Sequence, residues 1–155
     1  GTQPINGYNF GVKHYARVRQ TYRTAAFASL LISLAWFCVF RWGGGLLAAM
    51  FVTGEPLYQE FAAHCFRLYM LGFFVYGLPQ VTASFFQATG QPVKSLAVSL
   101  SRQALFLIPL AVLLSGRFGL DGALAAAPAA DMLAFLLAVC LVFREMRVWR
   151  HRNWI

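Results

Sequence analysis

Long apolar segments separated by short polar ones dominate the chain. Four of them, at residues 24–42, 61–87, 95–115 and 122–143, are long enough to cross a membrane. A transmembrane helix needs about 20 mostly apolar residues to cross roughly 30 Å of hydrocarbon. None of the four alternates with the period of two that marks a β-strand. We therefore predict an all-α, polytopic bundle of about four transmembrane helices, forming a single membrane domain over residues 1–155.

Two features interrupt this pattern. The run Leu46–Val52 follows three consecutive glycines and is too short to span, so we expect it to lie at the interface or to cap the first hairpin. Pro79, Pro109 and Pro128 lie inside the second, third and fourth spans. Each proline removes a backbone hydrogen bond, and a bend is therefore expected in each of these helices.

The composition agrees with a protein embedded in lipid. Hydrophobic residues make up 59% of the chain and charged residues only 12%, with a mean hydropathy of +0.60. A soluble domain carries about twice that charged fraction, and a chain of 17.3 kDa cannot bury so much apolar surface by itself. The net charge is +8, but the basic residues fall between apolar segments rather than along one soluble face, so no nucleic acid partner is expected.

The basic residues concentrate on one side of the predicted membrane. That side holds Lys13, Arg17, Arg19, Arg23, Lys94, Arg144, Arg147, Arg150 and Arg152. The loops on the other side hold Arg41 and Arg117 together with Glu55, Glu60 and Asp121. By the positive-inside rule, both ends of the chain are expected in the cytoplasm.

The segment Lys13–Arg23 is basic and amphipathic, with Tyr15, Val18 and Tyr22 on one helical face. We expect an ordinary cytoplasmic loop helix that lies on the lipid headgroups. The alternative is a regulatory lipid-binding helix.

The second span has two different faces. Polar and aromatic residues in steps of three or four form a stripe, which we call the polar-aromatic stripe: Tyr69, Phe73, Tyr76, Gln80, Ser84 and Gln87. The opposite face is apolar: Leu71, Phe74, Leu78, Val81 and Phe85. Such a stripe either lines a water-filled cavity or makes hydrogen bonds between helices. Rings beside amides would suit a flat, hydrophobic, cationic ligand.

Arg102 and Asp131 lie well inside the third and fourth apolar segments. Each would cost about 2.5–3.5 kcal/mol if left alone near the middle of the membrane. Counted from Lys94 and Arg144, the two residues lie roughly 12 and 20 Å deep, a difference that an arginine side chain can bridge across a hairpin. We therefore predict a structural ion pair, the alternative being that Asp131 couples transport to protons.

The sequence has no set of residues typical of an enzyme. Cys38, Cys65 and Cys140 are isolated in apolar runs, where we expect them to be small packing residues. The three histidines are scattered, and the chain carries no metal-ligand cluster or phosphate-binding loop. We predict that the protein is not an enzyme and holds no metal or organic cofactor.

Four stretches together resemble the multidrug and toxic compound extrusion (MATE) family. They are Gly1-Thr-Gln-Pro-Ile-Asn-Gly-Tyr-Asn-Phe-Gly11, Ser84-Phe-Phe-Gln-Ala-Thr-Gly-Gln91, Ser101-Arg-Gln103, and Gly119-Leu-Asp-Gly-Ala-Leu124 with Pro128 and Asp131 following. Each is weakly specific alone, but their order and placement relative to the spans cover nearly the whole chain.

This resemblance implies a parent of about twelve spans in two six-helix lobes. Such a parent is a multidrug efflux antiporter of the bacterial inner (plasma) membrane, which exports organic cations or drugs in exchange for Na+ or H+. Residues 1–11 would end the eighth span, and the four predicted spans would be the ninth to twelfth, with a cytoplasmic C-terminus. The chain begins at Gly1 without an initiator methionine, so we expect the N-terminal lobe to be missing. The implied partners are the lipid bilayer, hydrophobic cationic small molecules and that N-terminal lobe.

The resemblance also implies that the tenth span helps to line the cavity between the lobes, which favours a substrate-facing role for the polar-aromatic stripe. Some family members carry a cation-binding acid in that span, whereas the matching segment here has no Asp or Glu. Coupling would then depend on an acid in the missing part or on Asp131. The alternatives are a small four-span scaffold or assembly protein, or a lipid or polysaccharide flippase relative, for which more cationic residues facing the cavity are expected.

Overall fold

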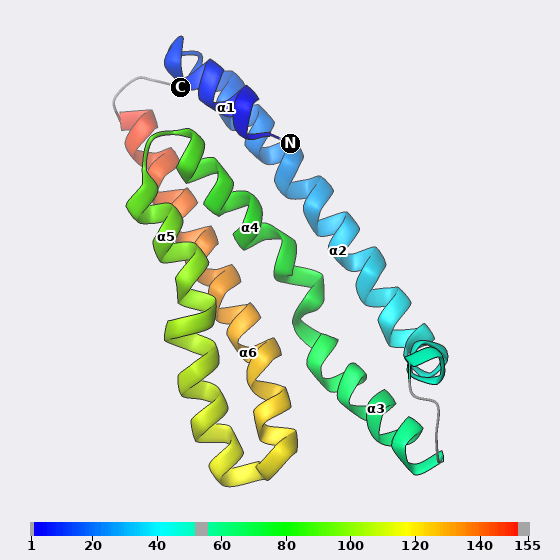
Figure 1. The fold of residues 1–155 in the computed structure, drawn as a ribbon. Helices are drawn as coiled ribbons and strands as arrows, with labels where there is room; N and C mark the ends of the chain where they lie inside the picture. Colours follow the sequence, from blue (N-terminus) through cyan, green and yellow to red (C-terminus); the bar gives the residue numbers. More distant parts are fainter. Residues whose placement is uncertain (1, 52–55, 152–155) are drawn as a thin grey trace.

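Helices account for every element in the computed structural model, which describes residues 2–51 and 56–151. In chain order they are α1 (Gln3–Gly11), α2 (Tyr15–Phe51), α3 (Pro56–Tyr69), the 3₁₀ turn η1 (Met70–Gly72), α4 (Phe73–Ala88), α5 (Pro92–Leu100), the π-helical segment η2 (Ser101–Leu107) and α6 (Ile108–His151) (Figure 1). The all-α prediction is confirmed. Gly1, Val52, Glu55 and Arg152, on which parts of the sequence analysis depend, lie outside the described residues.

Three helical stretches are long and apolar enough to cross a membrane: Tyr15–Leu46, Pro56–Ala88 and Pro92–His151. The last of them is 60 residues long and reverses direction at Gly119, whose φ of 62° and ψ of −137° are not helical. It therefore forms a hairpin, drawn in yellow at its tip in Figure 1. A Cβ atom on Gly122 would lie only 2.0 Å from the carbonyl oxygen of Leu114, so the two arms approach this closely because residue 122 is glycine.

Of the three prolines within the predicted spans, only Pro109 lies next to an interruption of the α-helix, whereas Pro79 and Pro128 lie inside α4 and α6. The turn η1 lies about two helical turns before Pro79, and the path bends there between α3 and α4 (Figure 1). The π-helical segment η2 ends two residues before Pro109. Because Pro109 has no N–H and its ring crowds the preceding turn, regular α-helical bonding cannot continue through this point. Pro128 lies inside α6. The run that begins at Leu46 continues α2 as far as Phe51.

The main hydrophobic core lies at the end of the bundle that carries both ends of the chain and the α4–α5 turn (Figure 1). It consists of Val18, Tyr22, Ala83, Phe85, Phe86, Val98, Ala138, Val142 and Trp149. From Tyr15 onward, the basic segment Lys13–Arg23 forms the first turns of α2, and its residues Val18 and Tyr22 are only 0% and 6% exposed. The segment is therefore not a loop helix but the start of a long helix, and its apolar face packs on α4 and α6 through Phe85 and Trp149.

Along the middle of α6 the buried residues are small, and many large apolar residues of the described chain face outward. Four alanines of α6 in steps of four are fully buried: Ala126, Ala130, Ala134 and Ala138. They lie on a helix that contacts both η2 and α4, and small side chains let helix backbones approach closely. Phe27, Ile32, Leu105 and Leu136 are more than half exposed. Such extensive apolar surface is suited to lipid and not to water.

Candidate functional site

An ion pair joins the third and fourth predicted spans. The Arg102 Nε donates a hydrogen bond to the Asp131 Oδ1, linking η2 to α6. The side chains of Arg102 and Asp131 are 19% and 5% exposed. The charge of each is thus compensated by the other within a segment where either charge alone would be costly.

The Asp131 carboxylate fits against η1 because residue 72 has no side chain. A Cβ atom on Gly72 would lie 2.8 Å from both the Cβ and the Oδ2 of Asp131, and 2.7 Å from the Cα of Pro128. The Gly72 backbone, with φ −85° and ψ −5°, is one that other residues can adopt. The requirement for glycine is therefore one of space. The sequence analysis did not single out Gly72, for which the only signal was a glycine in the middle of an apolar helix.

Arg102 also contacts the polar-aromatic stripe. Its guanidinium carbon lies 4.8 Å from the centroid of the Tyr76 ring, within the range of a cation–π interaction. The Tyr76 ring stacks on Phe73, with centroids 5.5 Å apart and planes inclined by 10°. Gln80 donates a long hydrogen bond of 3.4 Å to the Tyr76 hydroxyl. Phe73, Tyr76, Gln80, Arg102 and Asp131 therefore form one continuous cluster between α4, η2 and α6.

The polar-aromatic stripe lies on the surface of the described part of the chain. Tyr69, Gln80 and Gln87 are exposed, while Phe73, Tyr76 and Ser84 are partly exposed. Leu78 and Phe85, on the opposite face of α4, are 6% and 0% exposed. Within residues 2–51 and 56–151, the hydrogen bond from Gln80 to Tyr76 is the only one that these six side chains make, and it stays within α4. The stripe is therefore accessible to a ligand, or to another part of the protein, that contacts this surface.

A second polar cluster, which the sequence analysis missed, ties the α4–α5 turn to the end of α6. The buried carboxylate of Glu145 accepts hydrogen bonds from Lys94, from Gln91 at 2.7 Å and from Trp149 at 3.0 Å. The Lys94 ammonium lies 5.6 Å from the centroid of the Phe86 ring. The sequence signal for this cluster was Glu145 itself. It is a single acid among the basic residues after the fourth span, four positions before a tryptophan.

The stretch Ser84–Gln91, one of those used for the family resemblance, builds this turn. The Thr89 hydroxyl donates to the Phe85 carbonyl at 3.0 Å and so satisfies a group at the end of α4. Gly90 then adopts a φ of 72°, in the left-handed region that glycine enters without steric cost. This turn places Gln91 and Lys94 within hydrogen-bonding distance of Glu145.

In the part of the chain that the structure describes, no three His, Cys, Asp or Glu side chains gather closely enough to hold a metal ion. His64 and Asp121 pair at 3.0 Å, linking α3 to α6 near the hairpin tip, where both side chains are more than half exposed. Cys38 and Cys65 are partly buried, in agreement with packing roles, whereas Cys140 is exposed on α6.

Comparisons with known proteins agree on one family. The MatE family model matches residues 1–113. The structure superimposes on the MATE multidrug transporter DinF-BH, solved in complex with rhodamine 6G, with a TM-score of 0.86 and 34% identity over 93% of this chain and 32% of that one. It also superimposes on a multidrug resistance MATE family transporter of the MOP superfamily in its inward-facing conformation, with a TM-score of 0.87 and 18% identity over 98% and 35% of the two chains.

A mutant of the Vibrio cholerae MATE transporter VcmN gives a TM-score of 0.84 and 21% identity over 98% of this chain and 34% of the other. No curated protein sequence matches the chain. The chain thus spans about a third of the length of the solved transporters that it matches. It is a multi-pass membrane protein, and it belongs to the MATE family of transporters.

Proposed function

We propose that this chain is the C-terminal part of a multidrug efflux antiporter, which exports organic cations and other hydrophobic drugs in exchange for Na+ or H+. The proposal places it in the bacterial inner membrane with its C-terminus in the cytoplasm. The observation that carries it is the exposed polar-aromatic stripe on a chain of the MATE family. In a two-lobe transporter, substrate sites lie near the middle of the membrane where the lobes meet.

The chemistry of the stripe suits a flat hydrophobic cation. Tyr69 and Phe73 offer aromatic rings, and rings attract cations through their negative faces. Gln80 and Gln87 are exposed and offer amide groups that can orient a drug by hydrogen bonds. The Arg102 guanidinium covers one face of Tyr76, and Phe73 stacks on the same ring. We therefore assign cation binding chiefly to Tyr69 and to the remaining face of Phe73.

The charge balance favours a drug exporter over a flippase relative. A carrier of long anionic lipids needs an excess of positive charge along its pathway. Arg102, which borders the stripe, is neutralised by Asp131, so this surface carries no net positive charge from the pair. Family membership favours a transporter over a four-span scaffold.

The test is transport by the complete protein encoded by the gene, reconstituted in liposomes with an imposed Na+ or H+ gradient, with rhodamine 6G as the probe. Gln80→Ala and Gln87→Ala each remove one amide from the stripe. Gln20→Ala is the matched control, because Gln20 is exposed on α2. A hydrogen bond contributes about 0.5–1.5 kcal/mol, so each stripe variant should raise the half-saturating probe concentration about 2–10-fold, and the control should not.

Gradient-driven probe movement with this pattern of variants supports both the activity and the assignment of the stripe. Movement that all three variants leave unchanged would keep the antiporter but remove the stripe from its substrate site. No movement under either gradient, in liposomes where the same protein moves a long-chain anionic lipid carrier, would favour the flippase alternative.

A further inference from the structure

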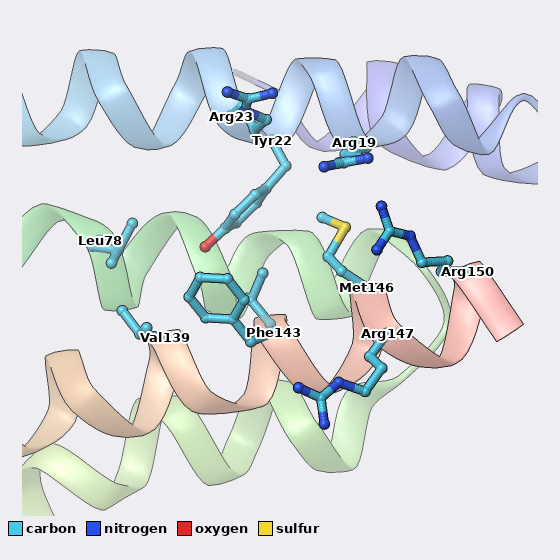
Figure 2. A pocket seen from close by; sticks show the side chains of 10 residues that line it. Arg19, Tyr22, Arg23, Leu78, Val139, Phe143, Met146, Arg147 and Arg150 are labelled. Carbon is cyan, nitrogen blue, oxygen red and sulfur yellow. The ribbon is translucent and has the colours of Figure 1, made fainter. Parts of the chain in front are cut away.

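A cavity of ≈ 640 Å³ lies between α2, α4 and the C-terminal part of α6, and it belongs to neither polar cluster described above (Figure 2). Its walls are Arg19, Tyr22, Arg23, Leu78, Val139, Val142, Phe143, Met146, Arg147 and Arg150. Leu78, the only residue that α4 contributes, is about 200° around the helix from both Tyr76 and Gln80. The cavity is thus on the opposite side of α4 from the polar-aromatic stripe.

The cavity is rich in positive charge that nothing in the described part of the chain neutralises. Four of its wall residues are arginines, Arg19, Arg23, Arg147 and Arg150, and none of its wall residues is acidic. Figure 2 shows Arg19 and Arg150 extending into the space between α2 and α6 from opposite sides. The ion pairs formed by Asp131 and Glu145 use Arg102 and Lys94 instead. Clustered guanidinium groups without a counter-charge favour an anionic ligand.

The other wall residues are mostly apolar, and Leu78 and Val139 lie at the opposite end of the cavity from Arg19 and Arg150 (Figure 2). Val139, Phe143 and Met146 continue along α6 from the arginines toward the middle of the fourth predicted span. From Arg150 back to Val139 the helix rises by roughly 16 Å. Phe143 is 72% exposed, so this apolar section is open at its side. The cavity is therefore cationic at the end near the chain termini and apolar toward the membrane centre.

We propose that this cavity binds an acidic glycerophospholipid from the leaflet next to the two chain ends. The headgroup phosphate lies between Arg19 and Arg150, and one acyl chain follows Val139 and Phe143. Guanidinium groups bind phosphate oxygens through paired hydrogen bonds, which gives this headgroup an advantage over one with no net charge. The cavity is charged near the chain ends and apolar toward the membrane centre. A phospholipid in this leaflet has its headgroup and acyl chains arranged along the same direction. This inference does not rest on the proposed drug transport.

The experiment is native mass spectrometry of the complete protein in detergent, titrated with dioleoyl phosphatidylglycerol or dioleoyl phosphatidylcholine, which have the same acyl chains. The cavity variant Arg19→Gln/Arg150→Gln is compared with Arg17→Gln/Arg144→Gln, which removes the same charges from α2 and α6 at exposed positions outside the cavity. We expect the acidic lipid to bind about tenfold more tightly than the zwitterionic one. The cavity variant should lose about tenfold in affinity for it, and the control less than about twofold.

Two further variants test binding of the acyl chain and binding of the headgroup separately. They also keep the proposal testable if the glutamine variant does not fold. Val139→Trp fills the apolar section without changing charge, and it should weaken binding of the acidic lipid. Arg19→Lys/Arg150→Lys keeps the charge but loses the paired hydrogen bonds, and it should bind with intermediate affinity. If the glutamine variant does not fold, the lysine variant and Val139→Trp carry the test.

Three results would overturn the proposal. Equal losses in the cavity variant and its control would show general attraction to basic helix ends. Equal affinity for the two lipids would remove the role of the headgroup charge. Displacement by inorganic phosphate, with no effect of Val139→Trp, would assign the arginines to a free anion.

Discussion

Removing one partner of the Arg102–Asp131 pair should destabilise the protein, and the two partners should differ in cost. The Asp131 side chain is 5% exposed and enclosed by η1, whereas the Arg102 side chain is 19% exposed. An arginine that loses its partner can extend its long side chain toward the interface, but the enclosed carboxylate cannot follow. We expect Arg102→Met to lower the free energy of unfolding by about 3–5 kcal/mol. Asp131→Asn, whose amide can still accept a hydrogen bond, should cost about 1–3 kcal/mol.

The double variant Arg102→Met/Asp131→Asn should be little less stable than Asp131→Asn alone, because it leaves no unpaired charge. The coupling free energy should therefore be close to the cost of Arg102→Met alone, about 3–5 kcal/mol. The assay is reversible unfolding of the complete protein in mixed micelles during titration with a denaturing detergent. Asp121→Asn is the control, because its pair with His64 is more than half exposed on both sides and should contribute less than about 1 kcal/mol.

Strictly additive losses, or a larger loss for Asp131→Asn than for Arg102→Met, would refute this reasoning. The same variants also test the alternative role of Asp131. If Asp131→Asn keeps its stability but loses proton-driven transport, the carboxylate serves coupling, and the ion pair is not its main purpose.

Two smaller substitutions test the packing. Gly72→Ala should destabilise the complete protein by about 1–3 kcal/mol in the same unfolding assay, because its Cβ would lie 2.8 Å from Asp131. Gly43→Ala, where nothing lies within 4 Å of the added atom, should be neutral or stabilise by up to about 1 kcal/mol, and equal losses at both glycines would contradict the steric argument. Tyr22→Phe removes a buried hydrogen bond of 2.8 Å to Thr82 and should cost about 0.5–1.5 kcal/mol in thermal or detergent unfolding, whereas an unchanged stability would show that Thr82 finds another partner.

The sequence by itself determined the helical class and the approximate position of each long helix. In lipid, a spanning segment must satisfy its own backbone hydrogen bonds and be apolar over a set length. Both properties are local and can therefore be read from one segment at a time. The depth of Arg102 and Asp131 was readable in the same way, since depth follows from counting residues along a helix.

Apart from the Arg102–Asp131 pair, which depth along the helices predicted and the structure contains, only the tertiary structure decided which side chains meet. The contacts of Arg102 with Tyr76 and of Asp131 with Gly72 depend on how each helix is rotated about its axis. The 3₁₀ and π-helical interruptions change that rotation midway along the second and third spans. The same limit explains why the sequence analysis missed the Glu145 cluster, whose partners come from the α4–α5 turn.

The N-terminal basic segment shows the difference most clearly. Its amphipathic pattern correctly identified one apolar face, since Val18 and Tyr22 are buried. The pattern did not say what would cover this face, because lipid and another helix are equally apolar. In the tertiary structure, protein covers this face. Arg19 and Arg23 line a cavity together with Arg147 and Arg150, which lie more than a hundred residues later in the chain. Hydropathy thus determines whether a face avoids water, and only packing determines its neighbour.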